Sequence, residues 1–270
     1  MPANKRLIIG ACGQIGTDLT ITLREKYGID NVVTVDLREP DHLLKEGHHE
    51  KLDALNPEDI KVVLKKHEIA EVYLLAAMLS ATGEKNPAMA WHINTQSLVN
   101  LLELAHEGYI QKLFWPSSIA VFGPGARKYD CPQESTGEPS TIYGMSKHAG
   151  ESLCNYYHKK FVVDVRSLRY PGLIGHRSLP GGGTTDYAVD IFHAALKDHY
   201  YTCFLEQATT LPMMYMPDAV RAAMELMEAP AAKIEVRKSY NLSAMSFAPQ
   251  EIAASIKQFV PGFTIDYAPD

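Results

Sequence analysis

The chain has 270 residues, of which 46% are hydrophobic and 21% charged, the balance of a globular protein with one large α/β domain or two modest ones. Its formal net charge of −6 argues against nucleic acid or an anionic membrane as the main partner, and no apolar run approaches the roughly 20 residues needed to span a bilayer. The first apolar run begins near Arg6, which leaves no room for a signal peptide. The cysteines are scattered without a C-x-x-C pair, so we expect reduced thiols and a cytoplasmic protein.

Short apolar runs alternate with amphipathic stretches over the first 170 residues, a pattern that predicts a doubly wound, Rossmann-type parallel sheet in the α/β class. The expected strands cover 6–9, 32–35, 71–77, 112–115 and 163–170, and the expected helices 17–27, 56–66, 88–105 and 140–160. From about Pro171 the pattern loosens into glycine-rich loops and shorter elements. We therefore expect a nucleotide-binding domain over 1–170 and a smaller substrate-binding lobe mainly over 171–270, with strands returning to the main sheet.

Three glycines separate the first strand from the first helix, at Gly10, Gly13 and Gly16. A strand, a glycine turn and a helix in this order form the context that a dinucleotide-binding motif requires. The backbone N–H groups at the helix start, including those of Gln14 and Ile15, can then hold a pyrophosphate with help from the helix dipole. The spacing is G-x-x-G-x-x-G, not the commoner G-x-G-x-x-G.

Asp36 ends the second strand, 20 residues after Gly16. A carboxylate at this point accepts hydrogen bonds from the adenosine ribose hydroxyls and repels a 2′-phosphate, which favours NAD over NADP. Leu37 and Arg38 follow it, and the Arg38 guanidinium could instead accommodate that phosphate. We predict NAD, with residues 36–38 at the adenosine end.

Tyr143 and Lys147 lie four residues apart on an expected helix, so they share a face. A free phenol has a pKa of about 10, and a neighbouring ammonium lowers it toward the range of a general base. Ser117 and Ser118 lie at the carboxyl end of an expected strand, where doubly wound folds bind ligands. Ser118 is our choice to orient a substrate hydroxyl, with Ser117 as the second candidate and a helix-capping pair as the alternative.

The chain resembles the extended short-chain dehydrogenases/reductases over essentially its whole length, and within them the family of short-chain L-threonine 3-dehydrogenases. The segments that carry the resemblance are 115–124, 169–174, 181–187, 211–218 and 240–247. The glycine turn and Tyr-x-x-x-Lys are signals of the whole superfamily, whereas Gly-Gly-Gly-Thr-Thr-Asp-Tyr at 181–187 is much more specific. Members of the family usually continue beyond position 270, so part of the substrate lobe is expected to be absent or shortened.

The resemblance implies oxidation of the 3-hydroxyl of L-threonine to 2-amino-3-oxobutanoate, with NAD as hydride acceptor and no metal. Tyr143 would act as general base, Ser118 would orient the hydroxyl, and Lys147 would lower the pKa of Tyr143 and contact the nicotinamide ribose. Further cofactor contacts are expected from Asp53, Ala54, Leu75, Ala76, Ala77 and Leu173. Asn94 could hold a structural water behind the lysine, or be an ordinary exposed helical residue.

An amino-acid substrate needs partners for a carboxylate and an ammonium. Gly182 and Gly183 allow close approach of the backbone, and Thr184 or Thr185 can donate to the carboxylate. By resemblance, Ser80 would contact the substrate from the opposite wall. Asp186 could face the ammonium or cap the next helix, and Arg177 is a weaker carboxylate partner.

Other polar clusters have simpler interpretations. The spacing of His42, His48 and His49 matches no standard zinc site, and the methionines at 213, 214 and 216 are expected to pack around the substrate lobe. Two other functions remain open, a nucleotide-sugar epimerase or dehydratase and a non-catalytic NAD-binding regulator. By resemblance, we also expect a homodimer formed through helices 88–105 and 140–160.

Overall fold

The main sheet is parallel and lies at the centre of the computed structural model, which describes residues 5–135, 137–179 and 181–269. Within these residues it has six strands in the order β3-β2-β1-β4-β5-β7. Their bounds are β1 (Lys5–Ile9), β2 (Val32–Asp36), β3 (His49–Lys51), β4 (Ile69–Leu74), β5 (Lys112–Phe114) and β7 (Val165–Arg166). The strand order reverses between β1 and β4, and ligands of doubly wound sheets bind at the carboxyl ends of the strands at such a point.

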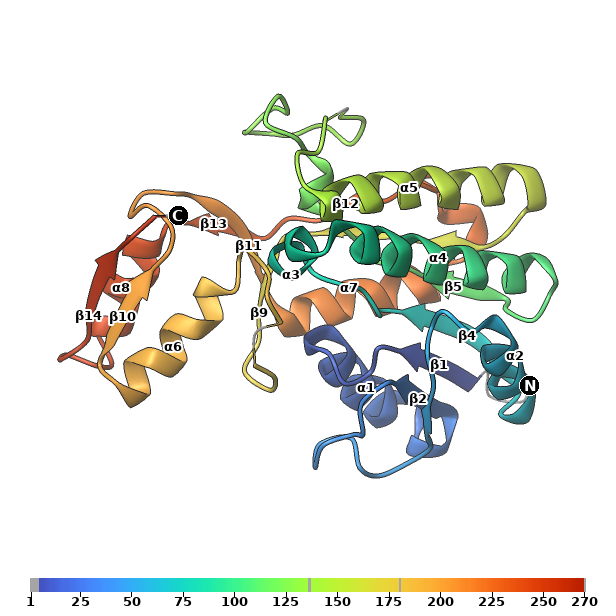
Figure 1. The fold of residues 1–270 in the computed structure, drawn as a ribbon. Helices are drawn as coiled ribbons and strands as arrows, with labels where there is room; N and C mark the ends of the chain where they lie inside the picture. Colours follow the sequence, from blue (N-terminus) through green and yellow to red (C-terminus); the bar gives the residue numbers. More distant parts are fainter. Residues whose placement is uncertain (1–4, 136, 180, 270) are drawn as a thin grey trace.

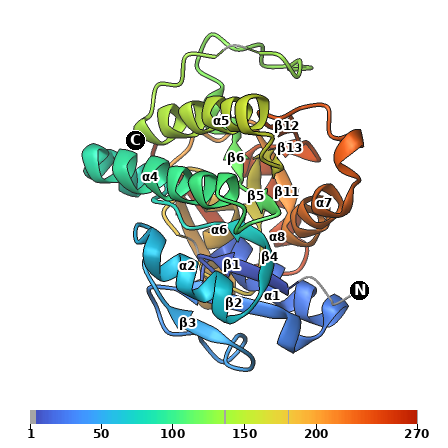
Figure 2. The same ribbon diagram turned by 90° about the vertical axis from the view of Figure 1, so that its right-hand side faces the viewer.

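Helices cover both faces of this sheet (Figures 1 and 2). On one face lie α2 (Pro57–Lys66), α4 (Pro87–His106) and α5 (Ile142–Phe161), and on the other α1 (Gln14–Tyr27) and α7 (Met216–Glu228). Side chains of β1 alternate between the two layers: Leu7 and Ile9 pack with α2, α4 and α5, whereas Ile8 packs with α1 and α7. The expected Rossmann-type fold is confirmed.

The long helices begin at polar caps that are visible in the sequence. Asn56 caps α2, Asn86 caps α4 and Thr141 caps α5, each accepting a hydrogen bond from a backbone N–H three residues later. The Thr141 cap is the most relevant to function, because Tyr143 and Lys147 lie in the first two turns of the helix that it starts.

The strand expected over 163–170 is divided into two, which corrects the prediction. β7 ends at Arg166, and β8 (Leu168–Tyr170) pairs instead with β6 (Ser117–Ser118) and β12 (Tyr240–Asn241). Pro116 has no N–H to donate, so the β5 ladder stops there and the chain enters the second sheet. This sheet positions Ser117 and Ser118 beyond the carboxyl end of β5.

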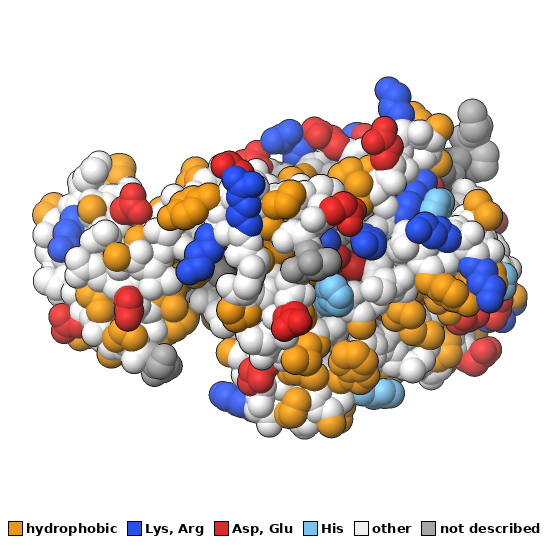
Figure 3. Space-filling view, turned by 90° about the horizontal axis from the view of Figure 1, so that it is seen from above, with side chains coloured by type: hydrophobic (Ala, Val, Ile, Leu, Met, Phe, Trp, Pro, Cys, Tyr) orange, Lys and Arg blue, Asp and Glu red, His pale blue; other side chains and the backbone are white. Residues whose placement is uncertain are grey.

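Residues after 170 divide between the main body and a separate lobe (Figure 1). α7 packs against α1, whereas the lobe contains α6 (Tyr187–Lys197), β10 (Tyr200–Cys203), α8 (Pro249–Lys257) and β14 (Thr264–Tyr267) around its own apolar core. A sheet of β9 (Gly172–Ile174), β11 (Leu211–Tyr215) and β13 (Met245–Phe247) connects the two parts. From above, an indentation separates the lobe from the main body (Figure 3). In the described chain, no helix is long and apolar enough to cross a bilayer.

Candidate active site

The glycine turn packs against the end of β4. Gly10 has φ +87°, and a Cβ there would lie 2.5 Å from the backbone nitrogen of Ala76. A Cβ at Gly16 would lie 2.3 Å from the carbonyl oxygen of Gly10. Leu75 and Ala76 both donate backbone hydrogen bonds to Ile9, so they lie beside the turn as expected of cofactor contacts. Only glycine allows this close approach of β1, α1 and the loop after β4.

The first turn of α1 is suited to an anion. Gly13 precedes the helix, no side chain of the described residues caps it, and its first turn contains no acidic residue. The buried side-chain nitrogen of Gln14 also has no hydrogen-bond partner within the described chain. N–H groups without partners at a helix N-terminus attract phosphate groups, so Gln14, Ile15 and Gly16 fit the pyrophosphate of NAD.

Asp36 is buried at the carboxyl end of β2 and organises the adenosine side of the turn. One of its oxygens accepts from the Cys12 N–H at 2.9 Å, and the other accepts from the N–H and the guanidinium of Arg38 at 3.0 and 3.3 Å. Arg38 is therefore paired with Asp36 itself. Leu37 is 61% exposed and can cover a flat ring. Burial and the Asp36 carboxylate raise the pKa of the Cys12 thiol to about 11.

Asp53 and Ala54, two further candidates for contact with the cofactor, form hydrogen bonds within the protein. Asp53 is exposed and accepts a hydrogen bond from the Leu55 N–H at 2.9 Å, forming the turn before α2. Ala54 is buried, and its carbonyl accepts from the Asn100 side chain. Leu173 lies in β9 opposite Met214. Ala77 lies in the loop that follows β4.

Asn94 is buried, so the alternative of an exposed helical residue is wrong. Its side chain accepts from the N–H of Met78 at 2.8 Å and donates to the carbonyl of Met78 at 3.0 Å. It also donates to the hydroxyl of Ser146 at 3.2 Å. Asn94 thus joins the loop after β4 to α5, one residue before Lys147.

Tyr143, Lys147 and Ser118 come together at the start of α5. The Ser118 hydroxyl lies beside the Tyr143 phenol and favours its ionised form. Ser118 also accepts from the Ala120 N–H at 3.2 Å, so it caps a short 3-10 helix as well as contacting Tyr143. Lys147 donates to the Pro116 carbonyl at 2.7 Å and lies 5.5 Å from the centre of the Tyr143 ring.

The protonation states differ from the expectation that Lys147 lowers the pKa of Tyr143. Burial raises the pKa of Tyr143 to about 12, and the Ser118 hydroxyl opposes this. Burial lowers the pKa of Lys147 to about 7, because its ammonium is enclosed away from water. In this structure burial is therefore the largest influence on the pKa of both groups.

Ser117 is removed as a candidate for contact with the substrate. Its hydroxyl is buried and donates to the Glu151 carboxylate at 2.6 Å, two turns along α5 from Tyr143. The sequence patterns did not single out Glu151 or its partner Arg169. The spacing of Tyr143, Lys147 and Glu151, four residues apart each time, was the available signal.

The glycine-rich segment near 182 is fixed by Asp186. One carboxylate oxygen of Asp186 accepts the N–H groups of Gly182 at 2.8 Å and Gly183 at 2.7 Å. Asp186 precedes α6 but makes no side-chain capping bond, so its carboxylate turns back on the glycines. Neither predicted role of Asp186, facing the ammonium or capping the helix, included this contact.

The expected substrate residues gather around this segment. Ala81, next to Ser80 in α3 (Ser80–Lys85), donates to the Gly182 carbonyl at 3.2 Å, so the start of α3 lies beside the glycine-rich segment. Thr184 is exposed, and Thr185 approaches β9 at Gly172.

Arg177 does not belong to this group. Its guanidinium pairs with the buried carboxylate of Asp18 in α1 at 2.5 Å. Because α1 also carries the glycine turn, this ion pair ties the segment after β9 to the cofactor side of the fold, and the guanidinium is engaged away from the substrate residues.

The remaining clusters have structural partners. His49 contacts the Thr34 hydroxyl at 3.0 Å, and no group of three potential metal ligands is found among the described residues. Met213 packs in the core of the lobe, whereas Met214 and Met216, the first residue of α7, pack in the core of the main body, so the expectation for the methionines holds only for Met213.

The sheet order, the glycine turn and the uncapped start of α1 define a Rossmann-type nucleotide-binding enzyme. The family model described as "NAD dependent epimerase/dehydratase family" matches residues 6–243, and the chain belongs to this family. Its cofactor is NAD and it is an oxidoreductase of the short-chain superfamily.

Solved and curated relatives cover nearly the whole chain. A partial consensus L-threonine 3-dehydrogenase is 55% identical with a TM-score of 0.96, over 98% of this chain and 86% of its own. A GalE-like L-threonine dehydrogenase from Cupriavidus necator, in its holo form, is 54% identical with a TM-score of 0.94, over the same shares of the two chains. An uncharacterized epimerase/dehydratase from Staphylococcus aureus is 47% identical over 98% of this chain and 83% of its own.

Proposed function

We propose that the protein oxidises the 3-hydroxyl of L-threonine to 2-amino-3-oxobutanoate with NAD. The observation that carries the proposal is the juxtaposition of Tyr143 and Ser118, in a chain whose solved relatives include L-threonine dehydrogenases. A phenol and a hydroxyl that lie side by side can both contact one alcohol oxygen of a substrate.

Tyr143 acts as the general base and takes the proton of the 3-hydroxyl. Its pKa of about 12 makes the phenolate scarce at neutral pH, so catalysis requires further stabilisation of the negative charge. A protonated Lys147, 5.5 Å from the ring, favours the phenolate by electrostatic attraction. Ser118 donates to the substrate oxygen as negative charge develops there.

Bound NAD supplies the acceptor for the hydride that leaves C3 of threonine. The chain holds it at the first turn of α1, at Asp36 and at the loop after β4, which together set the position of the nicotinamide relative to Tyr143. Arg38 remains paired with Asp36, which supports NAD over its 2′-phosphorylated form.

The amino-acid part of the substrate binds at the glycine-rich segment. Thr184 and Thr185 carry hydroxyl groups that can donate to the carboxylate, and Ser80 approaches from α3, adjacent to Gly182. Asp186 shapes the backbone of this segment through one carboxylate oxygen, and its second oxygen is our candidate partner for the ammonium.

A panel of substrates with purified protein tests this proposal. L-threonine should reduce NAD, whereas a nucleotide sugar should give neither reduction nor an epimer. Turnover of the nucleotide sugar instead would support the epimerase alternative, and NAD binding without any turnover would support the regulator.

Three broader expectations belong to the same proposal. We propose a homodimer through α4 and α5, although a solved relative 46% identical to the chain is named a monomeric L-threonine 3-dehydrogenase. Light scattering at micromolar concentration decides between the two states. We also propose a cytoplasmic location for the protein, whose cysteines are free in the described residues. Finally, we propose that residues 1–170 bind the cofactor and that residues 171–270 mainly bind the substrate.

A further inference from the structure

Three residues on one face of α5 contact one short segment that leads into the active site. Tyr143, Lys147 and Glu151 lie four residues apart, and their partners are Ser118, Pro116 and Ser117 respectively. The Lys147 and Glu151 contacts are 2.7 and 2.6 Å long. The three contacts together fix the position of α5 along β6, and Glu151 makes the one farthest from the reacting atoms.

The Glu151 carboxylate is held in place by Arg169 of β8. Arg169 donates to both oxygens of Glu151, at 2.8 and 2.7 Å, and the side chains are only 3% and 6% exposed. A two-pronged contact of this kind fixes the carboxylate plane as well as its position. A buried charge pair is costly to form and costlier to break, so the pair needs a reason beyond stability.

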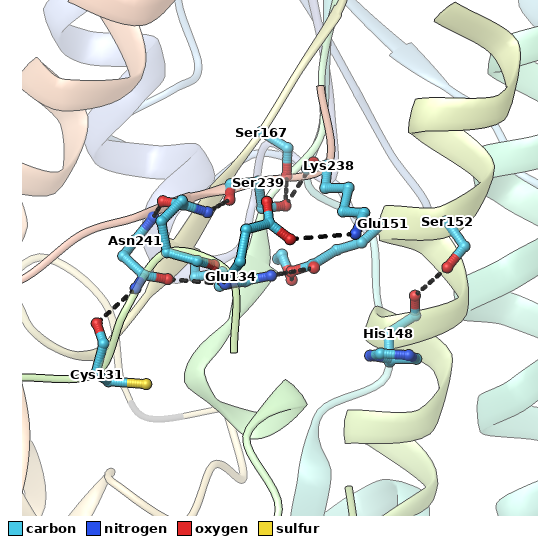
Figure 4. Close-up of polar contacts among 12 residues, drawn as sticks. Cys131, Glu134, His148, Glu151, Ser152, Ser167, Lys238, Ser239 and Asn241 are labelled. Atoms are coloured by element: carbon cyan, nitrogen blue, oxygen red, sulfur yellow. Dashed lines mark hydrogen bonds and ion pairs between the residues drawn. The ribbon is translucent and has the colours of Figure 1, made fainter. Parts of the chain in front are cut away.

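The remaining donors of Arg169 connect the pair to two other parts of the chain. Arg169 donates to the carbonyl of Gln133 and to the side chain of Asn241, both at 2.9 Å. Figure 4 shows Asn241 reaching back to Cys131 on one side, with Glu151 on α5 nearby. Every part of the guanidinium is engaged, which leaves Glu151 little freedom to move relative to β6.

Glu151 also contributes charge at Lys147. The titratable groups that act on Lys147 are Tyr143, Glu151 and Cys154 of α5, and Arg169 of β8 acts through Glu151. The ring of Trp115, the residue after β5, lies 4.6 Å from the Lys147 ammonium and carries no charge. Burial raises the pKa of the Cys154 thiol, so Cys154 is neutral at physiological pH and Glu151 is the anion that opposes the effect of burial on Lys147.

We propose that Glu151 is a positioning residue for the reaction at Tyr143: held by Arg169, it fixes α5 against Ser117 so that Tyr143 meets Ser118, and it presents its charge to Lys147, four residues earlier on the same helix. The kinetic part of this inference rests on the proposed oxidation of threonine, whereas the effect on Lys147 does not.

The test compares three variants with the wild-type protein. Glu151→Gln keeps the shape of the side chain and removes its charge, and Ser117→Ala removes the contact with β6 while keeping the ion pair. Asp164→Asn is the control, because it weakens another buried pair, with Arg166 at 2.7 Å, in a different part of the fold. Threonine-dependent kcat and KM, NAD affinity, and the titration of Lys147 by NMR with labelled lysine are measured for each.

Glu151→Gln is expected to lower kcat by ~10–100-fold, to leave NAD affinity nearly unchanged and to move the Lys147 titration to lower pH. Ser117→Ala is expected to lower kcat without moving that titration, and Asp164→Asn is expected to lower Tm alone.

The inference is overturned if Glu151→Gln changes only Tm, as the control does, or if Ser117→Ala has wild-type kcat. If Glu151→Gln does not fold, Glu151→Asp must keep the Lys147 titration near its wild-type position, and a shift to lower pH overturns the inference. A wild-type protein that ignores threonine contradicts the proposed function, but the Lys147 titration still decides the charge effect.

Discussion

The hydroxyl of Ser118 lies beside the phenol of Tyr143 and favours its ionised form, although one lies in β6 and the other in the first turn of α5. Thr141 fixes the start of α5 through the Gly144 N–H at 3.0 Å, and β8 fixes Ser118 through strand pairing with Tyr170. The reacting pair thus depends on two elements that meet only in the folded protein.

Removal of the Tyr143 hydroxyl should stop turnover without disturbing the fold. Tyr143→Phe keeps the ring and its packing, so we expect a loss of ~100–10,000-fold in kcat, the usual contribution of a general base. NAD affinity and Tm should stay near the wild-type values, measured by fluorescence titration and thermal unfolding. Turnover at the wild-type rate would exclude Tyr143 as the base.

Asp36 should decide between the two nicotinamide cofactors. Asp36→Ser removes the carboxylate and frees Arg38, so the ratio of kcat/KM for NADP to that for NAD should rise by roughly 10–100-fold. Glu39→Gln, in the exposed segment beside it, is the control and should leave the ratio unchanged. An unaltered preference in Asp36→Ser would place the ribose elsewhere.

Gly10 and Gly108 have nearly the same φ, but adding a methyl group should lower the unfolding free energy by different amounts. Gly10 and Gly108 have φ +87° and +86°, but a Cβ at Gly10 meets the Ala76 backbone, whereas one at Gly108 meets nothing within 4 Å among the described residues. We expect Gly108→Ala to cost about 1 kcal/mol of unfolding free energy and Gly10→Ala about 2–5 kcal/mol, because overpacking adds to the conformational strain. Urea unfolding measures both, and equal losses would mean that the close approach at Gly10 is absent.

Asp186 should matter for substrate affinity more than for the chemical step. Asp186→Ala removes the acceptor of the Gly182 and Gly183 N–H groups, so we expect KM for threonine to rise about 10-fold, with a smaller change in kcat. Asp190→Asn, one turn further along α6, is the matched control. A similar KM in both variants would show that the glycine segment does not need Asp186.

Lys147 should make stability depend on pH in a direction that can be worked out. Burial lowers its pKa from 10.5, the ordinary value of a lysine side chain, to about 7 in the folded protein, so above pH 7 the unfolded chain binds a proton that the folded chain lacks. Stability therefore rises with pH across that window, and the cost of burying the ammonium is fully present below it. Lys147→Met should remove this slope, measured as the difference between variant and wild type in urea unfolding at about pH 7 and about pH 9. Parallel slopes would contradict the lowered pKa.

Local patterns predicted the fold because its signals are local. The apolar run before Gly10, the caps at Asn56 and Thr141 and the four-residue spacing of Tyr143 and Lys147 are all visible within one element. The break at Ser167 was missed, because it arises where β8 leaves the main sheet to pair with β6 and β12. The burial of Asn94 and the pairing of Arg177 with Asp18 likewise depend on segments far apart in the chain.

The pKa values depend on the same long-range contacts. The spacing of Tyr143 and Lys147 suggested that the lysine lowers the pKa of the phenol. In the folded protein, burial has the largest influence on the pKa of each group. The role of Asp186 could not be read from its position before a helix, since its carboxylate turns back toward Gly182 and Gly183.

A threonine dehydrogenase that uses NAD and depends on Tyr143 must reduce NAD when L-threonine is supplied. The rate of NADH formation, followed by its absorbance, is measured with NAD and L-threonine against L-allo-threonine, L-serine and no substrate, for the wild type and Tyr143→Phe. We expect wild-type reduction of NAD that is fastest with L-threonine and is lost in the variant. Saturable NAD binding without reduction by L-threonine would show that the protein is not this enzyme.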